Sequence, residues 1–307
     1  MTAPFWPRVS PAFLRVRLAV RPFAEGPVPI IGLSGGPDSV ALVAAARAEG
    51  APAHAVIIDH DLQKRSAEVA QHAAALAARC GCPSTIVRID VPTADEGMEA
   101  AARRSRYAAL EEFAAGRDIW VGHTMDDQAE TLLLSALRGR VTGMQSRRGN
   151  IVRPLLGVRR ADTVAACEEL GFEYWRDPHN EDTRFRRVAL RKQVLPVLNE
   201  IIGGDCVPAF AQAAADAALA HSFVQEGIVV GDTLEIAELQ VHPARRRQLI
   251  AAWLHHHNAQ VKGDTISAIE RLVTDWHGQG EVLVGAQGLA VRRRGGILSV
   301  SHSTRDR

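Results

Sequence analysis

The chain has 307 residues, of which 47% are hydrophobic and 23% charged, and this composition excludes a disordered or collagen-like protein. Its length favours two domains of about 150 residues each. The formal net charge of +1 excludes a uniformly basic nucleic-acid-binding chain and leaves only local basic segments to consider.

The N-terminal segment has no uninterrupted apolar core. Arg8, Arg15, Arg17 and Arg21 break up its apolar residues, whereas a signal peptide needs a continuous apolar stretch. No apolar run in the chain approaches the ~18 residues of a transmembrane span. The sequence therefore predicts a cytoplasmic protein without a membrane segment.

Short apolar runs alternate with alanine-rich helical stretches in the first two thirds of the chain. Strands are expected at 28–33, 55–59, 85–89 and 118–122, and helices at 38–48, 66–79, 96–115 and 126–137. Apolar strands that alternate with helices are typical of a parallel sheet covered on both faces. Right-handed crossovers then make the predicted fold a doubly wound α/β domain.

The rest of the chain is predicted to be mainly helical. Beyond a hinge-like stretch at 154–157, helices are expected at 161–170 and 183–198. Gly203, Gly204 and Pro208 then interrupt the pattern, so we expect two domains, at 1–205 and 206–307. The smaller C-terminal domain is expected to contain helices at 210–227, 243–256 and 265–276, followed by short strands at 281–285, 289–293 and 297–301.

A glycine turn joins the first expected strand to its helix in the string Ser34-Gly35-Gly36-Pro37-Asp38-Ser39. Two glycines let the backbone turn tightly and approach a ligand, and the N–H groups at the start of a helix bind phosphate. The serine hydroxyls can donate further hydrogen bonds, and Asp38 can hold a divalent cation. The alternative is a simple turn in which Asp38 or Ser39 only caps the helix. Neither a Walker string nor Gly-x-Gly-x-x-Gly is present, which disfavours those nucleotide sites.

Three acidic residues mark the start of the helix expected at 126–137. Asp126 and Asp127 open it, and Glu130 follows one turn later on the same side. A carboxylate cluster at this edge of the sheet can bind magnesium, hold an amine or act as a base. The alternative is an acidic helix start that only complements the helix dipole.

The spacing of the cysteines and histidines does not predict a metal site. The four cysteines contain no Cys-x-x-Cys pair, so we expect buried thiols and no zinc or iron–sulfur centre. His255, His256 and His257 are adjacent and cannot share one helical face, so we expect an exposed helix end.

The glycine turn resembles the SGGxDS loop of the N-type ATP pyrophosphatase (PP-loop) superfamily, and later motifs resemble its tRNA(Ile)-lysidine synthetase family. The string GHTMDDQAET at 122–131, followed by Leu137-Arg138-Gly139, is similar to that family's GHxxDDxxET and LRG motifs. Further similar strings are Asp59-His60-Asp61-Leu62, Arg103-Arg104-Ser105-Arg106-Tyr107, Arg153-Pro154-Leu155-Leu156, Arg176-Asp177-Pro178 and Arg187 with Arg191, Leu195 and Pro196. The chain departs from the family at Val188, where Asn is usual.

The resemblance implies an ATP-dependent ligase that joins L-lysine to carbon 2 of the wobble cytidine in an isoleucine tRNA with a CAU anticodon. ATP would first adenylate the carbon-2 oxygen and release pyrophosphate, and the lysine ε-amine would then displace AMP. The product would read the codon AUA instead of AUG and carry isoleucine instead of methionine.

The resemblance also implies roles for individual residues. ATP would contact Ser34, Gly35, Gly36, Pro37, Asp38 and Ser39, and Mg²⁺ would contact Asp38 and Asp127. Catalytic roles would fall to Asp38, Arg103, His123, Asp126, Asp127 and Glu130. Contacts with tRNA would come from Arg106, Tyr107, Arg138, Arg187 and Arg191, and the C-terminal domain would recognise the tRNA.

An arginine-dense segment fits a tRNA partner. Residues 138–192 contain thirteen Lys or Arg against seven Asp or Glu, a local charge of +6. Such a segment in a nearly neutral chain favours a local contact with phosphates. The alternative is a general arginine bias, because the whole chain has only three lysines.

Two other functions remain open at this point. A tRNA 2-thiocytidine synthetase would share the adenylation step, but that class depends on cysteine pairs. A nucleotide-sensing module without turnover would not need the acidic residues that this chain retains. A homodimer is compatible with the sequence.

Overall fold

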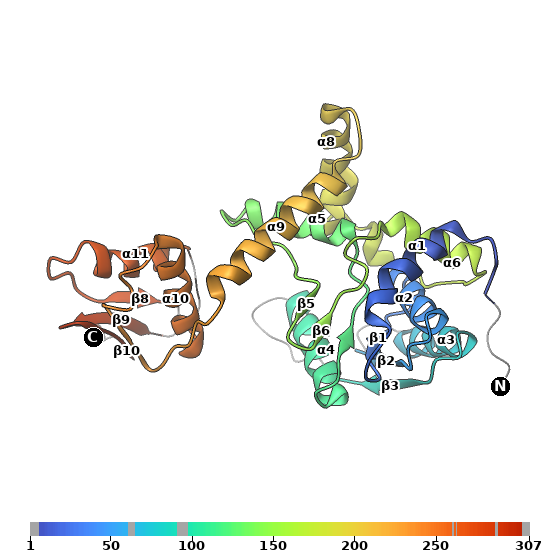
Figure 1. Ribbon diagram of the computed structural model, residues 1–307, viewed down its shortest axis with the longest axis horizontal. Coiled ribbons are helices and arrows are strands. Elements are labelled where there is room, and N and C mark those ends of the chain that lie inside the picture. The colour runs from blue at the N-terminus through green and yellow to red at the C-terminus, as the bar shows by residue number, and fades with distance from the viewer. Residues whose placement is uncertain are drawn as a thin grey trace. The chain divides into compact units, whose positions relative to one another are not determined.

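The computed structural model describes residues 6–60, 65–90, 98–259, 261, 263–285 and 288–302 (Figure 1). Asp61 and Leu62 of the predicted motifs lie outside the described residues. The chain divides into two compact units, Met1–Asp216 and Ala217–Arg307, and each is described by itself.

A six-stranded sheet forms the centre of the first unit, in the order β3-β2-β1-β4-β6-β5. Its strands are β1 (Ile30–Gly32), β2 (His54–Asp59), β3 (Ser84–Arg88), β4 (Ile119–Trp120), β5 (Arg147–Arg148) and β6 (Ile151–Val152). Neighbouring strands are parallel except for β5, which pairs antiparallel with β6. The predicted parallel α/β fold is confirmed. The β5–β6 hairpin was not predicted, because strands of two residues leave no periodic pattern.

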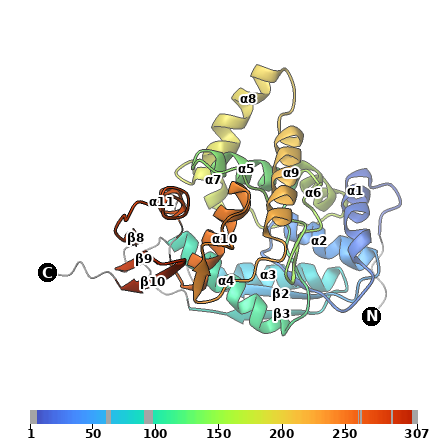
Figure 2. The ribbon, with the colours of Figure 1, turned by 60° about the vertical axis from the view of Figure 1, so that its left-hand side comes forward.

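Each face of the sheet has its own core, because successive strand residues point to opposite sides. The helices that border the sheet are α1 (Pro11–Val20), α2 (Pro37–Ala48), α3 (Ser66–Arg79), α4 (Met98–Ala114) and α6 (Arg160–Glu169). Ile31 and Trp120 pack against α1, α2, α3 and α6. Ile30 and Ile119 pack against α4 on the other face. Figure 2 shows α2 and α3 lying over β2 and β3.

Helix α1 was not predicted from the sequence, and it anchors α6. Phe13 and Val16 are fully buried between the two helices and the core. The carboxylate of Glu169 accepts hydrogen bonds from the backbone N–H groups of Ala12 (3.0 Å) and Phe13 (2.9 Å). A carboxylate at this position also complements the positive end of the α1 dipole. Contacts with α1 therefore help to hold α6 against the core.

The helix expected at 183–198 is present, but it is not a regular α-helix. After a 3₁₀ turn (Pro178–Glu181), the chain is helical from 186 to 202, as α7 (Arg186–Ala189), a π-helical turn (Leu190–Val194) and α8 (Leu195–Ile202). Pro196 has no N–H to donate to the preceding turn, so the backbone widens before it. Both views show α8 projecting from the rest of its unit (Figures 1 and 2).

Helix α5 (Met125–Ala136) and the first part of α9 (Val207–Gln225) complete the first unit. The start of α9 packs on α5 through Val207 and Ala129. The division between the units falls inside α9, whereas the boundary expected after residue 205 lies just before this helix.

The second unit combines two helices with a small antiparallel sheet. It contains α10 (Pro243–His256), α11 (Gly263–Thr274) and strands in the order β7-β10-β9-β8, which are β7 (Thr233–Glu235), β8 (Val282–Val284), β9 (Leu289–Arg294) and β10 (Ile297–His302). Trp253, Ile250, Leu272 and Leu298 are buried in its core. The predicted helices with terminal strands are confirmed.

Within the described residues, no single helix has the length and apolar composition to cross a membrane. One pair, 186–202 with 207–225, meets that criterion only when its two members, bent by 103°, are taken together.

Candidate active site

The glycine turn forms a tight loop at the N-terminus of α2. Gly35 has a φ of +84°, a conformation that favours glycine, and Gly36 precedes the helix in extended conformation. Ser39 Oγ accepts from the Ser34 N–H (3.2 Å) and donates to the Gly36 carbonyl (3.0 Å). The free N–H groups of the helix start can therefore face an anion. ATP binding by this loop remains a prediction.

Neighbouring segments hold the loop in place. The Trp175 N–H donates to the Gly35 carbonyl (2.9 Å) from the segment after α6. Gly122 follows β4, and a Cβ built there would lie 2.9 Å from the carbonyl carbon of Asp38 and 3.0 Å from Ser39 N. The end of β4 and the first turn of α2 approach each other this closely because residue 122 has no side chain.

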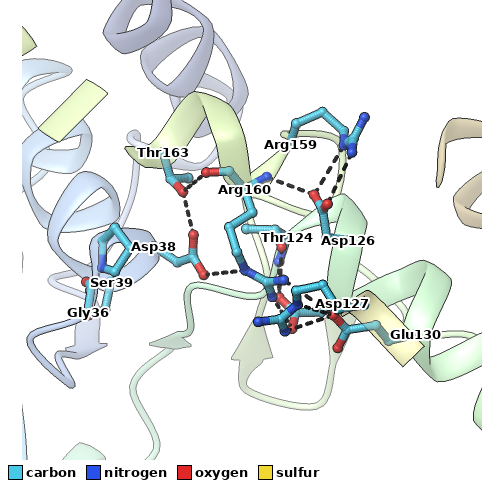
Figure 3. Close-up of polar contacts among 12 residues, drawn as sticks. Gly36, Asp38, Ser39, Thr124, Asp126, Asp127, Glu130, Arg159, Arg160 and Thr163 are labelled. Atoms are coloured by element: carbon cyan, nitrogen blue, oxygen red, sulfur yellow. Dashed lines mark hydrogen bonds and ion pairs between the residues drawn. The ribbon is translucent and has the colours of Figure 1, made fainter. Parts of the chain in front are cut away.

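The acidic residues predicted from the sequence lie together beside this loop (Figure 3). Asp127 Oδ2 accepts from both the N–H and the hydroxyl of Thr124 (2.8 Å each), which caps α5. Asp126 Oδ2 accepts from the Arg160 N–H (2.7 Å). Asp38 reaches the same group from α2, because its Oδ1 accepts from the Thr163 hydroxyl and its Oδ2 contacts Arg160.

Arg159 and Arg160 neutralise these acids. The Arg160 guanidinium contacts Asp127 Oδ1 (2.7 Å) and Glu130 Oε1 (3.3 Å), besides Asp38. Arg159 contacts both oxygens of Asp126 (3.2 Å each). Together with Arg187 and Arg191, these residues form what we term the carboxylate–arginine network, namely Asp38, Asp126, Asp127, Glu130, Arg159, Arg160, Arg187 and Arg191.

Glu130 is the most enclosed member of the carboxylate–arginine network. Its side chain has no exposed surface and pairs with three guanidiniums. Arg191 donates to Oε1 through Nε (2.9 Å) and Nη2 (2.8 Å), and Arg187 donates to Oε2 (3.3 Å). The negative charge of Glu130 is thus already balanced within the protein. Its contacts indicate that Glu130 positions the surrounding arginines.

His123 lies next to the network and pairs with Arg153. The Arg153 Nε donates to His123 Nδ1 (3.2 Å), so the ring proton of the neutral histidine is on Nε2. Burial, together with Arg103 and Arg153, lowers the pKa of His123 to about 3 even though Asp127 opposes this shift. His123 is therefore a neutral hydrogen-bond donor at physiological pH.

The predicted residues of α4 form a basic group on the side of His123 and Arg153. The Arg103 guanidinium lies over the Tyr107 ring at 5.0 Å. Arg106 has its Nε buried without a hydrogen-bond partner, and burial lowers the pKa of this guanidinium. Among the described residues, no hydrogen bond or ion pair joins Arg103, Arg106 or Tyr107 to the carboxylate–arginine network.

The other residues predicted to contact tRNA separate into two classes. Arg138 is exposed after α5, in keeping with a contact outside the protein. Arg187 and Arg191 instead point to Glu130. Val188, where Asn is usual, is 5% exposed and packs in the protein interior.

Two family models match the chain, a PP-loop domain over residues 17–198 and a TilS substrate binding domain over residues 234–298. The chain is 49% identical over 308 residues to the tRNA(Ile)-lysidine synthase of Corynebacterium glutamicum, covering 96% of each protein. The tRNA(Ile)-lysidine synthase of Corynebacterium diphtheriae is 50% identical over 97% of this chain and 99% of its own length. The chain belongs to the tRNA(Ile)-lysidine synthase family. The resemblance drawn from the motifs is confirmed.

A solved structure outside the tRNA(Ile)-lysidine synthase family has the same fold. The U34-tRNA thiolase NcsA from Methanococcus maripaludis, with its [4Fe-4S] cluster, superposes with a TM-score of 0.55 over 72% of this chain and 80% of that chain. The identity is 15%, so the likeness concerns the fold alone. All four cysteines of this lysidine synthase family member are free, buried thiols, and burial raises the pKa of Cys80 to about 12.

Sequence reasoning missed Arg159 and Arg160, although the sequence contains a sign of their role. Both stand at the start of α6, where the helix dipole favours acidic residues and disfavours cations. Two arginines at such a position need acidic partners from elsewhere in the fold. In this member of the tRNA(Ile)-lysidine synthase family, α2 and α5 supply them.

Within the carboxylate–arginine network, the pKa values of Asp38 and Asp127 shift in opposite directions. Burial raises the pKa of Asp38, and Arg160 and Thr163 offset only part of this shift. Burial also acts to raise the pKa of Asp127, but Arg160, His123 and the Thr124 N–H outweigh it and lower the pKa to about 2. Asp127 is therefore held ionised, whereas the ionised form of Asp38 is destabilised by its surroundings.

The donor chemistry of the site fits magnesium that is shared with a nucleotide. No group of three or more His, Cys, Asp or Glu side chains within the described residues could hold a metal ion by itself. Mg²⁺ commonly uses one or two carboxylates together with substrate phosphates, and Asp38 and Asp127 can supply those carboxylates.

Gly122→Ala should disturb the nucleotide loop. Its methyl group would overlap the backbone of Asp38 and Ser39, so we expect a loss of about 1–3 kcal/mol in the free energy of unfolding and weaker ATP binding. Gly157→Ala is the control, because a Cβ there meets nothing within 4 Å. Chemical denaturation and ATP titration of both variants measure the effect, and equal results for the two would contradict the close approach.

His123 should make the protein more sensitive to acid. Its pKa falls from 6.5 in the unfolded chain to about 3 in the folded one, so only the unfolded chain takes up this proton within that interval. Stability should therefore fall as the pH drops from 6.5 towards 3, by at most about 1.4 kcal/mol per pH unit from this residue. Unfolding measured across that range should show a shallower slope for His123→Gln than for the wild type.

The exposed His255 provides the control for this experiment. His255→Gln should leave the slope unchanged between pH 6.5 and 3. The same slope in His123→Gln and His255→Gln would contradict a neutral, buried His123.

Proposed function

We propose that this protein is the tRNA(Ile)-lysidine synthase of its organism, a ligase that joins L-lysine to carbon 2 of the wobble cytidine of CAU-anticodon isoleucine tRNA in the cytoplasm. The observation that carries the proposal is the PP-loop turn next to the carboxylate–arginine network, in a chain about 50% identical over nearly its full length to named lysidine synthases. A carbon-2 carbonyl oxygen is a poor leaving group, so the reaction needs activation by ATP.

The reaction has two steps. The carbon-2 oxygen attacks the α-phosphate of ATP, and the bond to pyrophosphate breaks. The lysine ε-amine then attacks carbon 2, a carbon–nitrogen bond forms, and AMP leaves with the former carbonyl oxygen. The N–H groups of the loop at 34–39 would hold phosphates, and Mg²⁺ held by Asp38 and Asp127 would neutralise charge on them.

The amine of lysine also needs a partner in the site. It is an ammonium ion at neutral pH, with an unperturbed pKa of ~10.4, and must lose a proton before it can attack. Three guanidiniums already compensate Glu130, and Asp127 would hold Mg²⁺, so we assign capture of the ammonium to Asp126. His123, a neutral donor through Nε2, can hydrogen-bond the carbonyl or adenylate oxygen at the same edge of the sheet.

Mass analysis of nucleosides from tRNA incubated with the enzyme, ATP and lysine tests the function. Lysidine should form only when all three substrates are present, and without lysine the adenylated tRNA should accumulate. A sulfur-containing cytidine as the product would support the thiolation alternative. ATP binding with no product under any condition would support the sensing alternative.

Exposed arginines should govern the salt dependence of tRNA binding. Arg138 and Arg148 are both exposed, and a protein that neutralises phosphates releases counterions. Arg138→Gln with Arg148→Gln should therefore weaken tRNA binding and flatten the plot of log affinity against log salt by about 1 unit per lost contact. ATP affinity should not change.

Arg15→Gln provides the control for charge, because Arg15 pairs with Asp162 on the α1–α6 side of the first unit. Filter binding at several salt concentrations measures all three proteins. An unchanged salt slope in the double variant would contradict phosphate contacts by these two arginines.

A further inference from the structure

The Arg160 guanidinium lies between carboxylates of two helices. Its Nε is 3.3 Å from Asp38 Oδ2 of α2, its Nη2 is 2.7 Å from Asp127 Oδ1 of α5, and its Nη1 is 3.3 Å from Glu130 Oε1 (Figure 3). The Arg160 side chain is 20% exposed. A cation in the first turn of α6 opposes the helix dipole, so these acids account for its position.

Glu130 does not depend on Arg160 for its compensation. Arg191 donates twice to Glu130 Oε1, and Arg187 donates to Oε2. If Arg160 moved away, two guanidiniums would still face this buried carboxylate. The movement would therefore leave no unpaired charge at Glu130.

Asp38 and Asp127 have a different arrangement, in which each carboxylate is held by one oxygen and shares the other with Arg160. Thr163 donates to Asp38 Oδ1, and Thr124 donates twice to Asp127 Oδ2. The remaining oxygens, Asp38 Oδ2 and Asp127 Oδ1, both face the Arg160 guanidinium, and Asp127 Oδ1 also lies 4.0 Å from Arg187 Nη1. Departure of Arg160 would expose one oriented oxygen on each carboxylate while both side chains stay fixed.

We infer that Arg160 is a displaceable counter-cation of the nucleotide site. Arg160 gives up Asp38 Oδ2 and Asp127 Oδ1 to the Mg²⁺ that arrives with ATP, and its guanidinium turns to donate to the nucleotide phosphates. Two carboxylate oxygens completed by phosphate oxygens match the usual ligands of Mg²⁺. A planar guanidinium that leaves a carboxylate is equally suited to phosphate. This inference rests on the proposed ATP-dependent function.

The charges of the site agree with such an exchange. The carboxylates of Asp38, Asp127 and Glu130 are matched by Arg160, Arg187 and Arg191, so the group is neutral before the exchange. A divalent cation added to these carboxylates would leave Arg160 in excess, and the phosphates supply the matching negative charge. Each buried charge thus keeps a partner before and after ATP binds.

Magnesium titration without nucleotide tests the inference. In the wild type, Arg160 competes for the two oxygens, so millimolar Mg²⁺ alone should barely change the melting temperature. In Arg160→Gln the same Mg²⁺ should raise the melting temperature by about 3–6 °C over an EDTA sample at equal ionic strength. Arg15→Gln removes an arginine that pairs with α6 at Asp162, away from the loop, and should behave as the wild type.

Arg160→Lys provides a second test of the displacement if Arg160→Gln does not fold. A lysine ammonium is a point charge that cannot span the two oxygens, so binding of Mn²⁺ alone, measured by electron paramagnetic resonance, should tighten at least tenfold over the wild type. The Michaelis constant for ATP should rise in the same variant because the phosphate contact is impaired.

The outcomes separate this inference from the proposed function. Equal Mg²⁺ or Mn²⁺ affinity in the wild type and in the folded Arg160 variant would overturn the displacement. Lysidine formation by the wild type is assayed on the same preparation, and its absence would instead count against the proposed function.

Discussion

Replacement of Glu130 by glutamine should lower the free energy of unfolding of the first unit by about 3–5 kcal/mol. Glu130 is fully buried and faces Arg160, Arg187 and Arg191. Glutamine keeps the shape of the side chain but removes its negative charge. The three guanidiniums would then lose their shared counter-charge and repel one another at a site with little access to solvent. Turnover should also fall by about 100-fold, because displaced arginines no longer fix the geometry of the site. Chemical denaturation and AMP release measure the two effects.

Glu270 is the matched control in the other unit. It holds Arg246 (3.0 Å) and Arg247 (3.1 Å), and its side chain is 15% exposed. Glu270→Gln should destabilise the second unit while leaving ATP affinity unchanged, whereas Glu130→Gln should weaken ATP binding. Wild-type ATP affinity in Glu130→Gln would show that Glu130 does not position the site.

Asp38→Asn should greatly slow AMP formation and leave the fold intact. Burial raises the pKa of Asp38, which means that the folded protein disfavours its ionised form. In this variant Arg160 keeps Asp127 and Glu130 as partners, and asparagine can still accept from Thr163. We expect a change of less than about 1 kcal/mol in stability but a fall of about 10³-fold in turnover, because the charge acts on Mg²⁺ and the phosphates.

Asp162→Asn separates this effect from a general loss of acidic charge. Asp162 lies on α6 near Thr163 and pairs with Arg15 (2.8 Å) at the protein surface. Its replacement should leave both stability and turnover close to wild type. Near-normal turnover in Asp38→Asn would remove Asp38 from the reaction, and a large loss of stability would contradict its destabilised charge.

The sequence by itself determined the features that depend on neighbouring residues. The glycine turn at 34–39 and the acidic start of α5 are visible because their members stand within one or two helical turns of each other. The helices α2, α3 and α10 begin and end close to the expected residues for the same reason, since alanine-rich stretches and prolines act locally. Family motifs within these segments were sufficient to indicate the function.

Features that depend on long-range contacts were not visible in the sequence. The strand order, helix α1 and the β5–β6 hairpin follow from packing against partners far along the chain. The helix expected at 183–198 contains a π turn at 190–194, and this turn carries Arg191, which lies beside Glu130. Periodicity shows which residues could be helical, but it does not show where the backbone must bend to meet a distant group.

The partners of the acidic residues were also decided only by the tertiary structure. Asp38, Asp127 and Glu130 were predicted to act on ligands, and the fold adds Arg160 and Arg187 from segments 30 or more residues away. A charge that loses water on burial is stable only beside an opposite charge, and the chain can supply that charge from any segment that folding brings near. The sequence therefore revealed which groups carry the chemistry, and the tertiary structure decided which charges hold them in place.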